Sequence, residues 1–273
     1  MRSALVTGAS SGIGRACARA LHERGFAVWA GVRHEADAEA VAAEGMSALE
    51  LDVTDADAVS TAAAKFVEAT GGHLDVLVNN AGIAVPDPVE VLSDADLRRQ
   101  FDVNLFGLHR VTRTLLPAVL SAQGRIVQVG SSSGRTAMPF LGAYVASKFA
   151  LEGYSEALRR EIAPLGAHVV VIQAGQVATP IWGKSIPTQQ RLQQMPAHYR
   201  DAVAGLAAVV RRSGPGGISP ERVAATVSKA ATARRPRTRY GVPWQECLIV
   251  EMLSLLPGRV VDILVRREIE QAR

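Results

Sequence analysis

The sequence predicts a doubly wound α/β fold, in which helices cover both faces of a parallel sheet. Short apolar runs alternate with amphipathic stretches of helix length, which is typical of repeated strand–helix–strand units. Runs such as Val76-Leu-Val78 are apolar on both sides, as expected for strands that helices cover on each face. A chain of 273 residues is long enough to bury one large core of this kind. We therefore expect a single Rossmann-type domain over residues 1–273, built on a seven-stranded parallel sheet.

Seven short apolar runs are expected to form the strands. In chain order they are Ala4–Thr7, Ala27–Val32, Ser47–Leu51, Val76–Asn79, Arg125–Gly130, His168–Gln173 and Thr238–Val242. Two helix starts are indicated by capping spacings, at Thr54 with Asp57 and at Ser93 with Asp96. A third helix is expected to end before Pro164, because proline cannot continue a helix.

The alternation stops between Trp182 and Gly217. This stretch, residues 182–217, carries several prolines and is too long for a tight connection, so we expect an insertion with one or two short helices. It leaves the sheet at the carboxyl end of a strand, where ligands bind in this fold class, and this position favours a mobile lid over the substrate. A surface excursion without a function is the alternative.

The last segment, residues 244–273, becomes apolar again after Trp244. Leu248, Ile249, Leu253 and Leu256 are candidates for the apolar wall of a substrate cleft. Core packing or a subunit interface is the alternative for these residues. The segment is too short and too charged to span a bilayer, so we expect no membrane span.

Composition and charge argue against several classes of function. The formal net charge is +4, but the arginines late in the chain are interleaved with acidic and apolar residues, so we expect no nucleic-acid partner. The six histidines and two cysteines lack the spacing of metal ligands, so we expect no metal site. Cys17 and Cys247 are far apart, and a strand that begins at Ala4 leaves no room for a signal peptide; both observations favour the cytoplasm.

A glycine-rich turn joins the first strand to the first helix. Glycines let the backbone approach a pyrophosphate, and the amides at a helix N-terminus point toward it. The spacing is G-x3-G-x-G rather than the commoner G-x-G-x-x-G, and any tight strand–helix turn also requires glycine. The candidate dinucleotide contacts in this turn are Gly8, Ser10, Ser11, Gly12, Ile13 and Gly14.

The end of the second strand bears on the type of cofactor. An acidic residue at this place bonds the ribose 2′-hydroxyl of NAD. Here the strand ends at Arg33, and a guanidinium favours the 2′-phosphate of NADP. The alternative is that Arg33 is a solvent-facing strand end and that NAD is accepted as well.

Two further strand ends complete the candidate cofactor groove. Asp52 and Val53 follow the third strand, where a carboxylate could accept from the adenine amino group. The fourth strand ends in Asn79-Asn-Ala81-Gly82, whose small residues would admit a ribose. Turn formation alone would also account for this last motif.

Tyr144 and Lys148 are four residues apart, which places them one above the other on the same face of a helix. A phenol titrates near pH ~10, and a nearby ammonium together with oxidised nicotinamide would favour the phenolate. We expect Tyr144 to be the general acid/base and Lys148 to lower its pKa and orient the cofactor. Ser131 would hold the substrate oxygen, although three serines are adjacent here, and Asn104 would anchor a water that leads to Lys148.

Together these residues resemble the short-chain dehydrogenase/reductase family, in its single-domain branch. The resemblance covers nearly the whole chain and rests on Thr7–Gly14, Asn79–Gly82, Asn104, Ser131 with Gly134, and Tyr144-x-x-x-Lys148. It implies a catalytic tetrad of Asn104, Ser131, Tyr144 and Lys148, and it selects Ser131 from the three serines. It also implies that the segment with Val177 and Thr179 holds the nicotinamide carboxamide.

The stretches Val28–Arg33 and Ser147–Tyr154 are similar to the group of 17β-hydroxysteroid and retinol dehydrogenases. This similarity implies hydride transfer between NADP, or NAD, and a lipophilic alcohol, ketone or aldehyde. The family resemblance also implies a homodimer or homotetramer. A dinucleotide-binding sensor or scaffold without turnover is the competing function, and such a protein would be expected to lack Tyr144 or Lys148.

The chain departs from the family after the sixth strand. Where the family usually has Pro-Gly, this sequence has Gln173-Ala-Gly175. Gly175 still permits the turn, but alanine restricts the backbone less than proline does.

Overall fold

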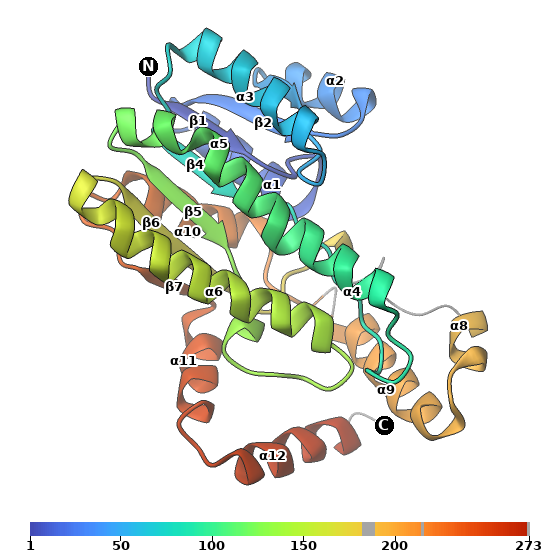
Figure 1. The fold of residues 1–273 in the computed structure, drawn as a ribbon. Coiled ribbons are helices and arrows are strands. Elements are labelled where there is room, and N and C mark those ends of the chain that lie inside the picture. Colours follow the sequence, from blue (N-terminus) through green and yellow to red (C-terminus); the bar gives the residue numbers. More distant parts are fainter. Residues whose placement is uncertain (182–188, 214–215, 272–273) are drawn as a thin grey trace.

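The fold is described by a computed structural model for residues 1–181, 189–213 and 216–271 (Figure 1). Seven parallel strands form one sheet in the order β3-β2-β1-β4-β5-β6-β7. They are β1 (Ser3–Val6), β2 (Ala27–Val32), β3 (Ser47–Glu50), β4 (Val76–Asn79), β5 (Arg125–Val129), β6 (His168–Ala174) and β7 (Arg239–Val242). Each predicted strand is present, and the predicted seven-stranded α/β fold is confirmed.

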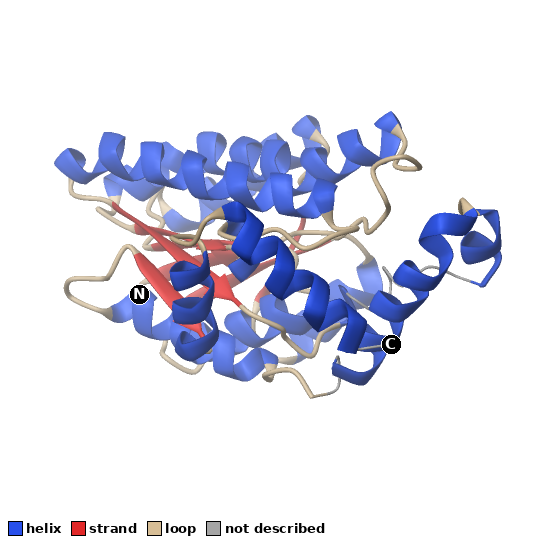
Figure 2. Ribbon diagram, turned by 90° about the horizontal axis from the view of Figure 1, so that it is seen from below, coloured by secondary structure: helices blue, strands red, loops and turns tan. Residues whose placement is uncertain are grey.

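Helices form a layer on each face of the sheet, as Figure 2 shows. One layer contains α1 (Gly12–His22), α2 (Glu35–Ala43) and α10 (Pro220–Thr232). The other contains α3 (Ala56–Thr70), α5 (Leu108–Ser121) and α6 (Gly142–Ile162). Successive strand residues point to opposite faces, so Leu5 packs in the α3–α5–α6 core while Ala4 and Val6 pack in the α1–α10 core. This double burial is why the strands lack polar alternation.

The two predicted helix starts have different outcomes. Ser93 caps α4 (Asp94–Phe101) as predicted, because its hydroxyl accepts the amide hydrogen of Asp96 at 3.0 Å. The start predicted at Thr54 is wrong by one residue. Asp55 caps α3 and accepts two first-turn amide hydrogens, while Thr54 donates its hydroxyl to Asp52 at 2.7 Å.

The segment after β6 holds α8 (Gln189–Gln194) and α9 (Ala197–Ser213). The six-residue α8 agrees with the expected short helices, whereas α9 is longer than expected. Residues 182–188 and 214–215 of the predicted lid lie outside the described part of the chain. α6 ends at Ile162 and is followed by a 3-10 turn that contains Pro164, as predicted.

The chain ends in α11 (Trp244–Leu253) and α12 (Gly258–Gln271), which extend away from the sheet beyond β7 (Figure 1). Within the described residues, no helix is both long enough and apolar enough to cross a membrane.

The position of the site follows from the order of the strands. β1 lies between β2 and β4, so the chain winds outward in opposite directions from this point, and the turns after β1 and β4 meet at one edge. The hydroxyl of Thr7, directly after β1, accepts the amide hydrogens of Asn80 and Ala81 after β4, at 2.9 and 3.0 Å. Ligands bind at such a switch point in this class of fold.

Candidate active site

A cleft of about 700 Å³ runs along the carboxyl ends of β1 to β6, a size that suits a cofactor with a small substrate. It brings together most of the predicted site residues: Gly8, Ser10, Ser11, Gly12, Ile13, Arg33, Asp52, Val53, Ala81, Gly82, Ser131, Tyr144, Lys148, Val177 and Thr179. Three predicted residues, Gly14, Asn79 and Asn104, do not line it.

The glycines of the turn after β1 are required by its backbone conformation and close packing. Gly8 and Gly12 have φ values of +63° and +54°, in the left-handed region that favours glycine. A Cβ at Gly14 would overlap the carbonyl oxygen of Gly8 and the side-chain amide of Asn80. Gly14 therefore closes the turn instead of contacting a ligand, and the turn presents backbone to the cleft.

The start of α1 suits an anion. The helix begins at Gly12, and the side chain of its N-cap residue, Ser11, makes no capping hydrogen bond. First-turn amides at a helix N-terminus attract negative charge, and Ser10 and Ser11 are exposed at the rim of the cleft. The residues present thus fit a pyrophosphate.

Asn80 lines the cleft, whereas Asn79, which was predicted to do so, does not. The side chain of Asn79 points to α5 and donates to the hydroxyl of Thr112 at 2.9 Å. Asn80 lines the cleft and donates to the carbonyl oxygens of Thr7 and Gly8, at 3.0 and 3.1 Å. Strand alternation could have distinguished Asn79 from Asn80 in the sequence, because the side chains of consecutive strand residues point to opposite faces of the sheet.

Arg33 and Asp52 both line the cleft at neighbouring strand ends. Burial acts to raise the pKa of the Asp52 carboxyl, but the hydrogen bonds from Thr54 and, to a smaller extent, the charge of the exposed Arg33 lower it below its usual value. Asp52 Oδ1 accepts the amide and hydroxyl hydrogens of Thr54, at 2.9 and 2.7 Å. These bonds fix the carboxylate and hold it ionised beside Arg33.

Tyr144 and Ser131 meet at the end of the cleft, from α6 and from the end of β5. Tyr144 is buried, and burial raises the pKa of its phenol while a hydrogen bond with Ser131 lowers it. The direction is opposite to the lowered pKa expected from Lys148, because loss of hydration is the largest influence on the phenol. A raised pKa keeps the phenol protonated at neutral pH.

Lys148 is buried one helical turn after Tyr144, as the spacing predicts. Its ammonium nitrogen lies 5.8 Å from the centre of the Tyr144 ring and donates to the carbonyl oxygen of Val129 at 3.0 Å. Burial lowers the pKa of Lys148 from 10.5 to about 8. The ammonium therefore keeps its charge at neutral pH, with further N–H donors next to the cleft.

Asn104 supports the wall of the cleft. It lies in a π-helical turn, Asp102–Gly107, between α4 and α5. Its carboxamide accepts the amide hydrogen of Ile83 at 2.9 Å and donates to the carbonyl of Ile83 at 3.0 Å and to the hydroxyl of Ser147 at 3.1 Å. Asn104 thus joins the segment after β4 to α6, which carries Tyr144.

The cleft also contains charged residues that were not predicted. Arg191 of α8 and Asp87 of the connection after β4 line it and form an ion pair at 2.9 Å. Asp96 and Arg99 of α4 line it too and are paired at 2.9 Å. No spacing in the sequence links Arg191 to Asp87, which are 104 residues apart.

The apolar wall predicted from α11 is wrong. Leu248 and Ile249 are 48% and 58% exposed, and neither these residues nor Leu253 and Leu256 line the cleft. The side of α11 that faces the protein carries Glu246, Cys247 and Val250 instead.

Comparison with known proteins identifies the family. The model of the short chain dehydrogenases matches residues 2–190. The chain belongs to the short-chain dehydrogenase/reductase family. It is therefore an NAD(P)-dependent oxidoreductase that acts on CH–OH groups.

Similar proteins extend over almost the whole chain. An NADPH-dependent 3-dehydrocapnine reductase from Ornithobacterium rhinotracheale is 33% identical, over 99% of this chain and 98% of its own. Retinol dehydrogenase 5 from Mus musculus is 37% identical, over 94% of this chain and 85% of its own. A crystal structure of a short-chain dehydrogenase from Streptomyces avermitilis superposes with a TM-score of 0.76 at 29% identity, covering 99% of this chain and 96% of that one.

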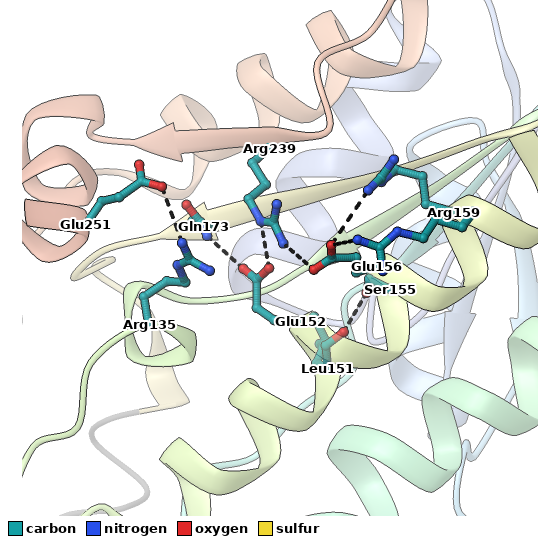
Figure 3. A network of polar contacts seen from close by, with 10 residues as sticks. Arg135, Leu151, Glu152, Ser155, Glu156, Arg159, Gln173, Arg239 and Glu251 are labelled. Atoms are coloured by element: carbon teal, nitrogen blue, oxygen red, sulfur yellow. Dashed lines mark hydrogen bonds and ion pairs between the residues drawn. The ribbon is translucent and has the colours of Figure 1, made fainter. Parts of the chain in front are cut away.

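In this short-chain dehydrogenase, side chains hold the end of β6, where Ala174 stands in place of proline. The amide of Gln173 donates to Glu152 of α6 at 2.7 Å, and Glu152 also accepts from Arg239 of β7 at 2.9 Å (Figure 3). The thiol of Cys247 donates to the carbonyl oxygen of Gln173 at 3.2 Å. These contacts connect the end of β6 to α6, β7 and α11.

Within the described residues, no cluster of three or more histidine, cysteine or acidic side chains has the arrangement of a metal site. Cys17 is fully buried, and burial raises the pKa of its thiol to about 12. This thiol therefore packs in the core as a small apolar side chain.

Proposed function

We propose that this protein is an NADP(H)-preferring dehydrogenase/reductase that interconverts a lipophilic secondary alcohol and its ketone, or an aldehyde. The observation that carries the proposal is the convergence of Tyr144, Ser131 and Lys148 at the end of a cleft that begins at an anion-binding helix terminus. A scaffold or sensor without turnover would not require a buried phenol and a buried lysine at this place, since burying both groups is unfavourable.

The chemistry follows from the protonation states of these groups. When bound, the reduced nicotinamide supplies a hydride for the carbonyl carbon of the substrate. Ser131 and Tyr144 hold the carbonyl oxygen between their hydroxyls, and the protonated phenol donates its proton to this oxygen as the alcohol forms. Lys148 donates one hydrogen to the carbonyl oxygen of Val129, and its other N–H groups would be available to bind the cofactor ribose.

The preference for NADP rests on Arg33. This exposed guanidinium lines the cleft directly after β2 and suits a 2′-phosphate. The name of the relative from Ornithobacterium rhinotracheale states a dependence on NADPH, which agrees with this proposal.

Arg33→Asp is expected to reverse the cofactor preference. A charge-assisted bond to the 2′-phosphate is worth about 1.5–3 kcal/mol, which is roughly ten- to a hundred-fold in affinity. Fluorescence titration with NADPH and NADH would measure both dissociation constants. Arg24→Asp is the matched control, because Arg24 is also exposed but precedes β2. Equal affinity of the wild type for the two cofactors would contradict the assignment.

The apolar lining of the cleft supports a lipophilic substrate. The segment after β4 contributes Ile83, Ala84, Val85 and Pro86, and Ile181 faces the cleft from beyond β6. Such a surface gains free energy by burying hydrocarbon. The relative from Mus musculus has a lipophilic alcohol, retinol, in its name.

The direct test is oxidation of NADPH, followed by absorbance, with a panel of ketones and aldehydes of increasing chain length. Turnover that improves as apolar length increases is the expected result. Tight binding of NADPH without turnover of any carbonyl compound, or of any alcohol with NADP, would favour a sensor or scaffold instead.

A further inference from the structure

The turn that follows β6 borders the cleft. Gly175, Val177 and Thr179 line it, and Thr179 lies next to Gly12 of the glycine turn. Backbone bonds hold parts of this turn: the amide of Gly175 donates to Val242 at 2.8 Å, and that of Ala178 donates to Ile218 at 3.0 Å. A side chain of the C-terminal helix α11 lies directly against the turn at Gly175.

This side chain is Glu246, on the inner face of α11. Its carboxylate lies directly against Gly175, where a Cβ would overlap it, and the neighbouring backbone amide of Gln176 acts to lower the pKa of this carboxyl. Ser132, the neighbour of Ser131, donates its hydroxyl to Glu246 Oε1 at 3.5 Å. One carboxylate thus contacts both the turn after β6 and the turn that carries Ser131.

The environment of Glu246 is unfavourable for a carboxylate. Burial raises the pKa of Glu246, and the bonds from Gln176 and Ser132 oppose this effect. The charged residues nearby form other pairs: Arg135 with Glu251, and Arg239 with Glu152 (Figure 3). No salt bridge to Glu246 is present within the described residues, so neighbouring neutral groups, the Ser132 hydroxyl among them, are what stabilise its charge.

We propose that Glu246 is a positioning residue for hydride transfer, which keeps the Gly175–Thr179 turn and the Ser131–Ser132 turn at a fixed separation. The role rests on the proposed function of the cleft. Because Glu246 belongs to α11, the C-terminal helix is part of the frame of the active site, although its exposed apolar residues do not line the cleft.

Three variants of Glu246 distinguish the effect of side-chain length from the effect of the carboxylate charge. Glu246→Ala removes the acceptor, Glu246→Asp keeps the charge but withdraws it by one methylene, and Glu246→Gln keeps an acceptor at full reach. Glu251→Ala is the matched control, since Glu251 lies on the same helix and is bonded to Arg135 instead.

We expect kcat with NADPH and a ketone substrate to fall about ten- to a hundred-fold in the Ala and Asp variants, because small displacements of reacting groups have effects of this size. The KM for NADPH should change less than about threefold, since the glycine turn and Arg33, which Glu246 does not contact, still hold the cofactor. The Gln variant and Glu251→Ala should retain a kcat close to that of the wild type.

Two results would overturn the proposal: a kcat of Glu246→Ala near the wild-type value, or a Gln variant as impaired as the Asp variant. Should Glu246→Ala not fold, the comparison of Asp with Gln decides. Hydrogen exchange at the Gln176 amide provides a readout that needs no turnover. Faster exchange in Glu246→Asp than in Glu246→Gln is expected, and equal rates would contradict the role even if the wild type proved inactive on every ketone.

Discussion

Tyr144→Phe is expected to lose about 10²–10⁴-fold in kcat while binding NADPH with nearly unchanged affinity. The substitution deletes the hydroxyl that donates to the carbonyl oxygen and keeps the buried ring. Burial holds the phenol of Tyr144 protonated, so the proton that completes reduction is lost with this hydroxyl. Steady-state rates with a ketone and titration with NADPH would measure the two effects separately.

Tyr154→Phe is the matched control for this experiment. Tyr154 lies on the same helix but contacts His109 at 3.1 Å and does not line the cleft. Its variant should keep wild-type kcat. Retention of a substantial fraction of kcat by Tyr144→Phe would rule out the role of general acid.

Lys148→Met is expected to abolish turnover and also to stabilise the protein at neutral pH. The ammonium is buried, and burial lowers its pKa from 10.5 to about 8, which corresponds to about 3 kcal/mol of unfavourable free energy at pH 7. Loss of the bond to Val129 would offset roughly 1 kcal/mol of the gain. Methionine has a similar volume and no charge to desolvate.

The sign of the pH dependence follows from proton uptake. Between about pH 8 and 10.5 the unfolded chain binds a proton at Lys148 that the folded protein has released. The free energy of unfolding of the wild type, relative to the variant, should therefore increase with pH across this window and decrease as pH falls through about 8.

Urea unfolding of both proteins at pH 7 and at pH 10 would test this. The advantage of Lys148→Met should be largest at pH 7 and shrink at pH 10. Lys65→Met is the control, because Lys65 is exposed on α3. A Lys148→Met protein that is less stable than the wild type at pH 7 would contradict the expectation.

Much of the fold could be predicted from local patterns. Strands such as β2 and β4 were predicted with the bounds that the structure has, because residues buried on both faces leave a continuous apolar run. The pair of Tyr144 and Lys148 was predictable for a similar reason, since helix geometry alone places residues four apart on one face.

Competing local contacts explain the smaller errors. Thr54 and Asp55 can both cap a helix, and the bond from Thr54 to Asp52 leaves Asp55 at the N-cap. Asn79 and Asn80 are adjacent and identical, and the strand's pleat decides that only Asn80 faces the cleft. The lid, the oligomeric state and the lipophilic substrate stay predictions.

By itself, the sequence determined the order of strands and helices along the chain, the glycine turn and the pairing of Tyr144 with Lys148, because each depends on neighbours within a few positions; the full candidate tetrad came from the resemblance to the family. Only the tertiary structure decided that Arg191 pairs with Asp87, that α11 leaves Leu248 and Ile249 exposed, and that Glu246 reaches the turn after β6. The raised pKa of Tyr144 was also decided by the tertiary structure, since it depends on burial of the phenol by distant segments. Such contacts join residues far apart in the chain, and a sequence carries no local periodicity or spacing that records them.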